Sequence, residues 1–329
     1  MDILNTLQIL NSCHGPSGDE QSIAEKILSL ASNCGDEHWV DSMGNLVIHK
    51  QGSGPKIMFA AHMDSIGLIA THIEDNGFIR FGRLGGLNLP AILHTNVRFA
   101  NGVRGAVCAD EGADSKLAIE SMYIDIGAES KEEAERSVRI GDSAVFDAPT
   151  YVAGNRIISP YLDNRISCVI LLSALETIAE TQNDLYFVFT SQEEVGIRGA
   201  KTAAYAIDPD YAVAIDVTVA DDIPGAKHYG SSVLGKGAAI KVMDNSVICH
   251  PEMVQKLNLL AAENNIAHQN DVIRAGGTDA GAIHVSRSGV RTGGISIPCR
   301  YVHSPAEMVQ ISDVQACINL TVSFAKSVL

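Results

Sequence analysis

Residues 56–64 have the sequence KIMFAAHMD, an apolar run that ends in His62 and Asp64. The turn signal GSGP at residues 52–55 bounds the start of this run, and short apolar runs with such a boundary are typical of strands buried on both faces. Parallel sheets contain strands of this kind, and ligands of open α/β sheets collect beyond the carboxyl ends of the strands. The imidazole and the carboxylate at the end of the run are therefore candidate functional groups.

The rest of the chain predicts an α/β fold. Apolar stripes at helical spacing predict two opening helices, one on each side of the turn GPSG at residues 15–18. After residue 154 helical and strand patterns alternate, which predicts a mostly parallel sheet flanked by helices. The predicted elements there are a helix over 164–180, strands over 185–190 and 211–215, a helix over 252–264, a strand over 294–297 and a terminal helix from residue 312.

Residues 68–154 have a different pattern, in which short β-branched pieces such as GFIRFGRLGG are interrupted by glycine. This pattern predicts a small β-rich domain inserted into a larger domain of residues 1–67 and 155–329. The length of 329 residues agrees with two domains, because a single core usually stops growing at ~250–300 residues.

Composition excludes several classes of partner. The chain has 24 Lys and Arg against 39 Asp and Glu, a net charge of −15, which repels nucleic acids and anionic membranes. Its 7 cysteines are scattered without a C-x-x-C pair, so neither a disulfide framework nor a thiolate zinc site is expected. No apolar run is long enough for a membrane span, and the first residues lack the order of a signal peptide. We expect a cytoplasmic protein.

Donor side chains follow each of the predicted strands named above, and one more precedes a predicted helix. Taken singly, an aspartate before a helix is usually an N-cap, and a pair of glutamates is usually a solvated turn. Their joint placement at one edge of a sheet is typical of a metal site instead. The five candidate ligands are His62, Asp163, Glu194, Asp216 and His303.

Charge balance predicts two divalent ions at this site. Three carboxylates in one pocket repel one another unless cations lie among them, and two divalent ions balance three carboxylates together with a bridging hydroxide. Asp64, two residues after His62, is expected to accept the proton of the imidazole nitrogen that does not bind metal. Glu193 is expected to face the bridging water as general base, because it points away from its neighbour Glu194 in an extended chain.

Two glycine-rich stretches are candidates for further sites. Residues 230–237 nearly match a phosphate-binding loop but lack the required serine or threonine, which excludes that interpretation. The loop GGTDAG at residues 276–281 leaves two interpretations open. Asp279 either caps a helix or faces a substrate together with the loop backbone.

Six motifs in chain order resemble those of peptidase family forty-two, the TET-type (tetrahedral) metallo-aminopeptidases that are also named glutamyl or deblocking aminopeptidases. The motifs are AAHMDSIG (60–67), LDNR (162–165), SQEEVGIRGA (191–200), AIDV (214–217), AGGTDAG (275–281) and RYVHSPAEM (300–308). The resemblance implies a phosphorylase/hydrolase-like fold of the dizinc exopeptidase type. It also implies that the insert is a dimerisation domain and that the dimers build a hollow dodecamer that admits short peptides.

Carried over to this chain, the resemblance implies that His62 and Asp216 hold one metal ion, that Glu194 and His303 hold the other, and that Asp163 bridges them. Zinc, cobalt or manganese would suit these donors. A basic group such as Arg300 could attract acidic peptides despite the negative net charge. We therefore hypothesise an aminopeptidase with Glu193 as general base.

The sequence leaves two alternatives to this hypothesis open and disfavours a third. A related two-metal amidohydrolase, such as an N-deacylase or a carboxypeptidase, and a catalytically silent oligomeric scaffold stay open. A glycosidase is disfavoured, because the adjacent Glu193 and Glu194 cannot easily flank a sugar bond at the ~5–9.5 Å separation which that chemistry uses.

Overall fold

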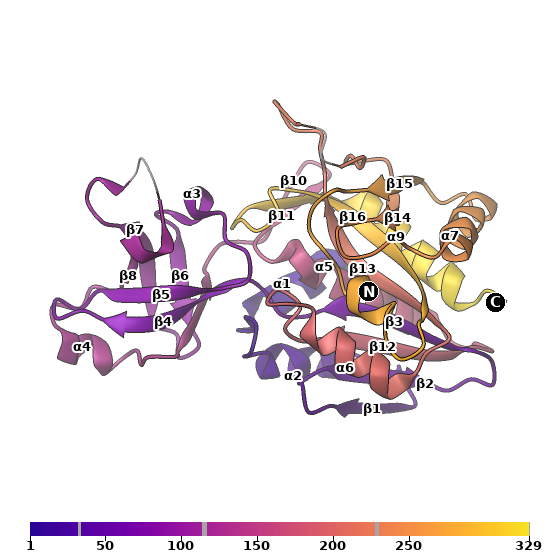
Figure 1. Cartoon of the computed structure of the whole chain (residues 1–329), viewed down its shortest axis with the longest axis horizontal. Coiled ribbons are helices and arrows are strands. Elements are labelled where there is room, and N and C mark those ends of the chain that lie inside the picture. The colour runs from indigo at the N-terminus through magenta and orange to yellow at the C-terminus, as the bar shows by residue number, and fades with distance from the viewer. Residues whose placement is uncertain (32–33, 114–116, 228–229, 329) are drawn as a thin grey trace.

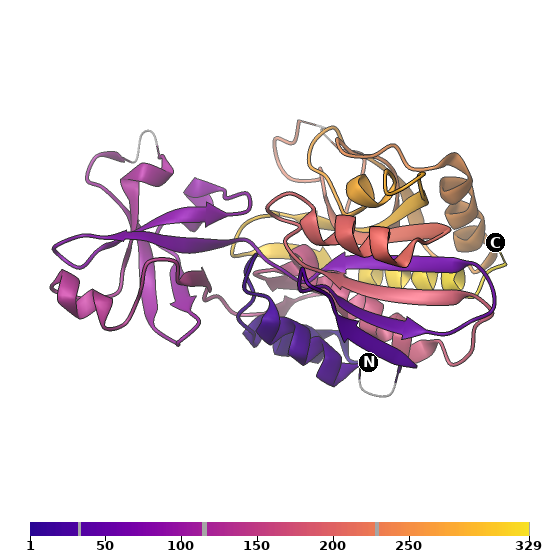
Figure 2. The same cartoon turned by 60° about the horizontal axis from the view of Figure 1, so that its bottom comes forward.

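The computed structural model describes residues 1–31, 34–113, 117–227 and 230–328. The chain forms a larger α/β domain and a smaller β-rich domain that projects from one side of it (Figure 1). In a second view the smaller domain still stands clear of the larger one (Figure 2). In chain order, the elements of the smaller domain lie between two groups of elements that form the larger one.

The centre of the large sheet consists of parallel strands that are buried on both faces. These strands are β12 (Asp184–Thr190), β3 (Lys56–His62), β13 (Tyr211–Val219) and β16 (Arg291–Arg300). Alternate residues of β3 belong to different core clusters, with Phe59 and Ala61 in one and Met58 and Ala60 in the other. Successive side chains of a strand point to opposite faces, so the apolar run has no polar position.

Helices cover both faces of the sheet. One core cluster includes residues of α1 (Ile3–Ser12), α2 (Gln21–Leu30), α5 (Leu162–Thr177), α7 (Pro251–Glu263) and α9 (Ile311–Ala325). The cluster on the other face includes residues of α6 (Arg198–Ile207) and α8 (Ala280–Ile283). Nearly all of α5 is buried, which explains its apolar sequence. Among the described residues, none of these helices has both the length and the apolar character that crossing a membrane requires.

The sheet is mixed, which corrects the expectation of a mostly parallel one. Its antiparallel pairings involve β1 (Glu37–Val40), β2 (Leu46–Lys50), β10 (Tyr151–Ala153), β11 (Arg156–Ser159), β14 (Ala238–Met243) and β17 (Glu307–Gln310). Beyond them, β15 (His268–Val272) pairs parallel with β14. Short connections such as those between β1 and β2 permit only antiparallel pairing. Alternation of helices and strands therefore predicts the centre of the sheet but not its edges.

The smaller domain is a closed barrel with its own core. Its strands are β4 (Gly67–Ile73), β5 (Ile79–Leu84), β6 (Asn96–Phe99), β7 (Arg104–Ala109), β8 (Met122–Asp125) and β9 (Ser143–Phe146), accompanied by α3 (Leu89–Ile92), a short 3-10 helix (Ile119–Ser121) and α4 (Lys131–Glu135). The barrel covers residues 67–146 rather than the expected 68–154. The difference arises because β10 pairs with β11 and so belongs to the large sheet.

Candidate functional site

The five candidate ligands converge at the carboxyl ends of the central strands. His62 is the last residue of β3, Glu194 lies in the turn after β12, and His303 lies in the loop after β16. Asp163 lies at the start of α5, where its own backbone is not helical (φ −78°, ψ 103°). Asp216 lies inside β13 rather than after it, because β13 continues its pairing with β16 beyond this residue.

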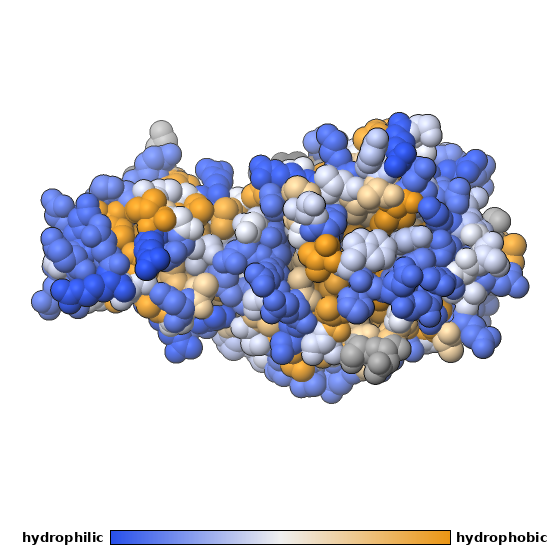
Figure 3. All heavy atoms as spheres, turned by 90° about the horizontal axis from the view of Figure 1, so that it is seen from below, coloured by the Kyte–Doolittle hydropathy of each residue, from blue (hydrophilic) through white to orange (hydrophobic). Residues whose placement is uncertain are grey.

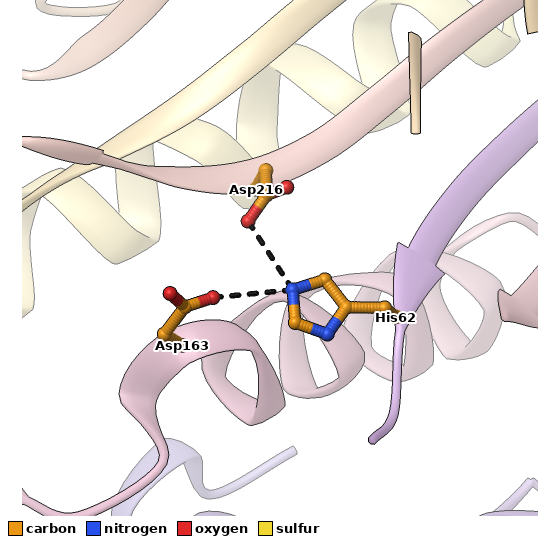
Figure 4. Close-up of side chains that lie close together, drawn as sticks. All are labelled: His62, Asp163 and Asp216. Carbon is orange, nitrogen blue, oxygen red and sulfur yellow. Dashed lines mark hydrogen bonds and ion pairs between the residues drawn. The ribbon is translucent and has the colours of Figure 1, made fainter. Parts of the chain in front are cut away.

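The potential ligand atoms of the described residues form two groups. One contains His62, Asp163 and Asp216 (Figure 4), and the other contains Asp163, Glu194 and His303. His62 Nε2 lies 3.1 Å from Asp163 Oδ1 and 3.7 Å from Asp216 Oδ1. His303 Nε2 lies 3.2 Å from Asp163 Oδ2 and 3.3 Å from Glu194 Oε2. Asp163 therefore offers one oxygen atom to each group.

Burial and neighbouring charges shift the pKa values of all these side chains. Burial raises the pKa values of Asp216 and Glu194, and the charge of Asp163 raises both further. Burial alone would raise the pKa of Asp163 too, but hydrogen bonds from His303 and His62 hold it below its usual range. Burial lowers the pKa of His303, whereas the carboxylates of Asp163 and Glu194 together raise it to about 11. A metal ion must therefore displace a proton from this imidazole.

One buried atom shows that the donor set fits metal ions. Oε1 of Glu194 is buried and has no hydrogen-bond partner among the described residues. A buried carboxylate oxygen without a partner is unfavourable, and a cation would satisfy it. Imidazole nitrogens and carboxylate oxygens are common ligands of zinc and of other divalent transition metals. The residues present therefore fit divalent cations.

Asp64 contacts this site through both its backbone and its side chain. Its carbonyl oxygen lies 3.1 Å from His62 Nδ1 and can accept that proton, while its carboxylate Oδ1 lies 3.5 Å from the same nitrogen. The carboxylate accepts hydrogen bonds from the backbone N–H groups of Glu193 (3.0 Å) and Glu194 (3.3 Å). The shorter contact to the His62 ring is therefore made by the backbone carbonyl of Asp64 rather than by its carboxylate, and the side chain holds the turn after β12.

Glu193 belongs to neither ligand group but lies beside one of them. Its Oε2 atom is 3.9 Å from His62 Nε2. Burial raises the pKa of Glu193 well above its usual value, despite the opposing effect of His62. Carboxyl groups with raised pKa values are suited to proton transfer near neutral pH. The position and the pKa of Glu193 are thus those of a candidate general base.

A cavity of about 530 Å³ opens beside both ligand groups. The five candidate ligands and Glu193 form one part of its lining. The remainder includes Val217 and Val219 of β13, Lys241 of β14, and the loop over residues 275–278. The buried side chain of Lys241 forms an ion pair with Asp271. The cavity therefore combines an acidic wall of candidate metal ligands with a partly apolar one.

Asp279 and Arg300 were both expected to contact a substrate. Neither is among the described residues that line this cavity. Asp279 is buried and accepts a hydrogen bond from the Thr190 hydroxyl at 2.6 Å. Burial raises the pKa of Asp279 to about 6. Arg300 donates two hydrogen bonds to the Asp222 carboxylate, at 2.7 and 2.8 Å. Internal partners thus engage Arg300 and one oxygen atom of Asp279, whereas Oδ1 of Asp279 is buried without a hydrogen-bond partner among the described residues. The substrate contact expected of each residue stays a prediction.

Comparison with known proteins identifies the family in which this chain belongs. The sequence matches the M42 glutamyl aminopeptidase family over residues 44–320. The chain belongs to this family. The lysyl aminopeptidase of Pyrococcus furiosus is 36% identical over 324 residues, which cover 93% of this chain and 92% of that protein. The resemblance found in the sequence motifs is thereby confirmed.

Solved structures of M42-like aminopeptidases share the whole fold. An aminopeptidase from the archaeon Desulfurococcus kamchatkensis matches with a TM-score of 0.95 and 40% identity, over 99% of this chain and 95% of that one. The TET1 peptidase of Pyrococcus horikoshii matches with a TM-score of 0.92 and 32% identity, over 99% and 100%. The chain is therefore an aminopeptidase, and its mixed-sheet α/β fold is that of the TET aminopeptidases.

Glu307 is a residue of this M42 site that sequence analysis did not assign. It is 1% exposed and accepts hydrogen bonds from the backbone N–H groups of His303 (2.8 Å) and Asp163 (2.9 Å). One carboxylate thus joins the loops that carry two candidate ligands. Glu307 lies within the motif RYVHSPAEM, four residues after His303, and that proximity was the available signal.

The barrel also contributes to the M42 site through Gly85 and Gly86, which follow β5. Gly86 lines the cavity, and a Cβ atom there would lie 2.9 Å from His303 Nδ1. A Cβ atom on Gly85, whose φ is +80°, would lie 3.0 Å from Glu194 Oε2. The inserted domain therefore forms part of the wall against which two candidate ligands pack.

Replacing Gly86 by alanine is expected to weaken metal binding about 10–100-fold, the usual effect of disturbing a neighbour of a metal ligand. The added methyl group would displace the His303 ring, which it approaches to 2.9 Å. Calorimetric titration of the metal-depleted protein measures this change. Gly82→Ala is the matched control, because a Cβ atom in that part of β5 meets its neighbours at 3.4 Å. Equal affinities in the two variants would contradict the packing role of Gly86.

Proposed function

We propose that the protein is a two-metal aminopeptidase that removes the amino-terminal residue from short peptides. The observation that carries this proposal is the position of Asp163, whose two oxygen atoms belong to different ligand groups. A carboxylate in this position can bridge two cations. Glu193 lines the same cavity and belongs to neither group, which leaves it available for proton transfer.

Each ligand group accommodates one divalent ion in this proposal. His62 and Asp216 would hold one ion, Glu194 and His303 the other, and Asp163 both. Zinc, cobalt and manganese all suit this donor set, and availability in the cell decides between them. When bound, the ions would supply Lewis acidity that lowers the pKa of a water molecule toward ~7 and polarises the scissile carbonyl group.

Proton transfer in this proposal is the work of Glu193. Its carboxylate takes a proton from the attacking water and later gives that proton to the leaving amine. The transfer requires a carboxylate held in a fixed position beside the site. The hydrogen bond from the backbone N–H of Glu193 to Asp64, at 3.0 Å, supports such a fixed position.

Peptides blocked at either end test this function. We expect release of the first residue from a short peptide with a free amino terminus, whether or not its carboxyl terminus is amidated, and no release from the acetylated peptide. Removal of metal by a chelator should abolish release, and added zinc or cobalt should restore it. Chromatography of the products measures both effects.

Each other outcome of this experiment identifies a different activity. Cleavage of the acetyl group indicates an N-deacylase, and loss of activity on amidation indicates a carboxypeptidase. The absence of any turnover by protein with a full complement of metal would indicate a silent scaffold. Any of these results would overturn the proposed aminopeptidase reaction.

Homo-oligomeric assembly is part of the proposal. The solved TET1 peptidase of Pyrococcus horikoshii is described as able to assemble into a tetrahedron or a large octahedral shell. Figure 3 shows apolar residues on the surface of the smaller domain, where Ile140 is 59% exposed. These observations support the barrel as a dimerisation domain and the tetrahedral dodecamer as the assembly.

The free thiols of all seven cysteines support a reducing compartment, the cytoplasm.

A further inference from the structure

The turn after β12 carries both Glu193 and Glu194, and its backbone is unusual. Gln192, which precedes them, has a φ of +53°. Residues other than glycine seldom adopt this left-handed conformation unless surrounding structure holds them in it. The contacts that hold Gln192 therefore also determine where the following carboxylates point.

Two buried carboxylates accept hydrogen bonds from the backbone N–H groups of three successive residues in this turn. Glu20 accepts the N–H of Gln192 at 3.1 Å. Asp64 accepts the N–H groups of Glu193 and Glu194, at 3.0 and 3.3 Å. Each hydrogen bond to an ionised acceptor is stronger than one between neutral groups. These hydrogen bonds thus hold the backbone N–H groups of all three residues of the turn.

Glu20 belongs to the segment over residues 15–20, which also reaches Asp64. Ser17 donates a hydrogen bond from its hydroxyl group to Asp64 Oδ2 at 2.6 Å, and its backbone N–H bonds to Ser65 O at 3.1 Å. Glu20 itself also accepts the N–H of Gly18 at 2.8 Å. This segment therefore supplies Glu20, one of the two carboxylates that hold the turn. It also contacts Asp64, the other one.

Burial of the Glu20 carboxylate lowers the stability of the fold unless specific partners compensate for its lost hydration. Its residue is 7% exposed, and burial raises its pKa even though the N–H groups of Gly18 and Gln192 act in the opposite direction. Charged groups are seldom buried unless a specific partner compensates. No ion pair of Glu20 occurs among the described residues, and its hydrogen bonds are to backbone N–H groups. The compensation therefore comes from the segment and the turn that it joins.

We infer that Glu20 is a positioning residue for the general base, because it holds Gln192 in the conformation that aims Glu193 at the site. This role rests on the proposed function of Glu193. Glu20 touches neither the ligand groups nor the cavity beside them. Misplacement of a reacting group by about 1 Å lowers the rate by ~100-fold. Loss of the Glu20 contact should accordingly reduce kcat and leave KM and the metal content almost unchanged.

Three variants test this role. In Glu20→Ala we expect kcat to fall about 10–100-fold, with KM within about threefold of the original value. Glu20→Gln should recover most of kcat, because its amide oxygen can still accept the Gln192 N–H. The matched control is Glu25→Ala. Glu25 is an exposed glutamate of α2, the helix that Glu20 precedes, and its one hydrogen bond among the described residues is to Gln21 of that helix. It should retain the original kcat.

Hydrogen exchange provides a second measurement that does not depend on activity. The amide of Gln192 should exchange faster in Glu20→Ala than in the unaltered protein and in Glu25→Ala. If Glu20→Ala does not fold, Glu20→Asp replaces it in the same measurement. Its carboxylate is one methylene shorter and should no longer reach the Gln192 N–H, so faster exchange at Gln192 is expected there too. Unchanged exchange at Gln192 in the variant that removes the Glu20 contact, or a kcat loss there that only follows a loss of metal, would overturn the role of Glu20. An unaltered protein without turnover would refute the proposed function instead.

Discussion

Replacing Glu193 by glutamine is expected to lower kcat by about 100-fold or more, the usual range for loss of a proton-transfer group, while both metal ions stay bound. Glutamine has nearly the same shape as glutamate but cannot take a proton from water. Glu193 lies outside both ligand groups, with its Oε2 atom 3.9 Å from His62 Nε2. The number of bound ions should therefore not change. Steady-state kinetics and elemental analysis of the same sample measure the two quantities.

The same substitution at the next residue is the control for this experiment. Glu194→Gln removes a charge from the group that contains His303, so we expect it to lose metal as well as activity. Two variants that differ only by one position in the chain then separate proton transfer from metal binding. Retention of full turnover by Glu193→Gln would exclude Glu193 as the base. Loss of metal from that variant would reassign it as a ligand.

Replacing Asp163 by alanine is expected to remove both metal ions and to abolish activity. Its Oδ1 atom lies 3.1 Å from His62 Nε2, and its Oδ2 atom lies 3.2 Å from His303 Nε2. A side chain shared in this way contributes to both ions, so its loss leaves each group with only two of its three donors. Activity should fall by at least ~1,000-fold, because the Lewis acid is lost together with the nucleophile that it generates.

Metal stoichiometry distinguishes Asp163 from the other candidate ligands. Asp216→Ala should lose one ion and keep the other, because Asp216 belongs to one group only. Asp279→Asn is the control for metal content, since Asp279 is equally buried but bonds to Thr190 and lies outside both groups. Asp163→Ala protein that still holds one ion tightly would show that the carboxylate does not bridge.

Residues at the ends of apolar runs made much of the site predictable. His62 and Glu194 follow strands whose ends are clear in the sequence, and the carboxyl ends of parallel strands meet at one edge of a sheet. Asp216 was found by the same rule although its strand continues to Val219. The rule worked because alternate positions near a strand end still face the same cavity. The strand was predicted to end at Ile215, so Asp216 was expected after it rather than inside it.

Contacts made through the backbone could not be predicted in this way. Glu307 and Glu20 accept N–H groups from loops that are distant in the sequence, and no residue pattern reveals such a partner. The partners of Asp279 and Arg300 were hidden for the same reason, because Thr190 and Asp222 lie far from them in the sequence. A sequence shows that a polar group exists but not which neighbour satisfies it.

The edges of the large sheet and the closure of the barrel were also beyond the sequence. Strand and turn signals placed the insert, but only pairing partners determine whether a strand such as β10 belongs to the barrel or to the large sheet. Pairing depends on long-range contacts, whereas strand patterns are local. The fold class was therefore predictable, and the topology at the boundaries was not.

The glycine pair at residues 85 and 86 also bears on how this architecture can change during evolution. The barrel is a module whose elements lie between those of the larger domain. Here the module contains part of the wall that supports His303 and Glu194. A chimera that takes its barrel from a relative must therefore inherit a glycine-compatible loop after β5. Recombination at the outer junctions would replace this loop together with the barrel, and a bulkier residue in the loop would displace His303 or Glu194.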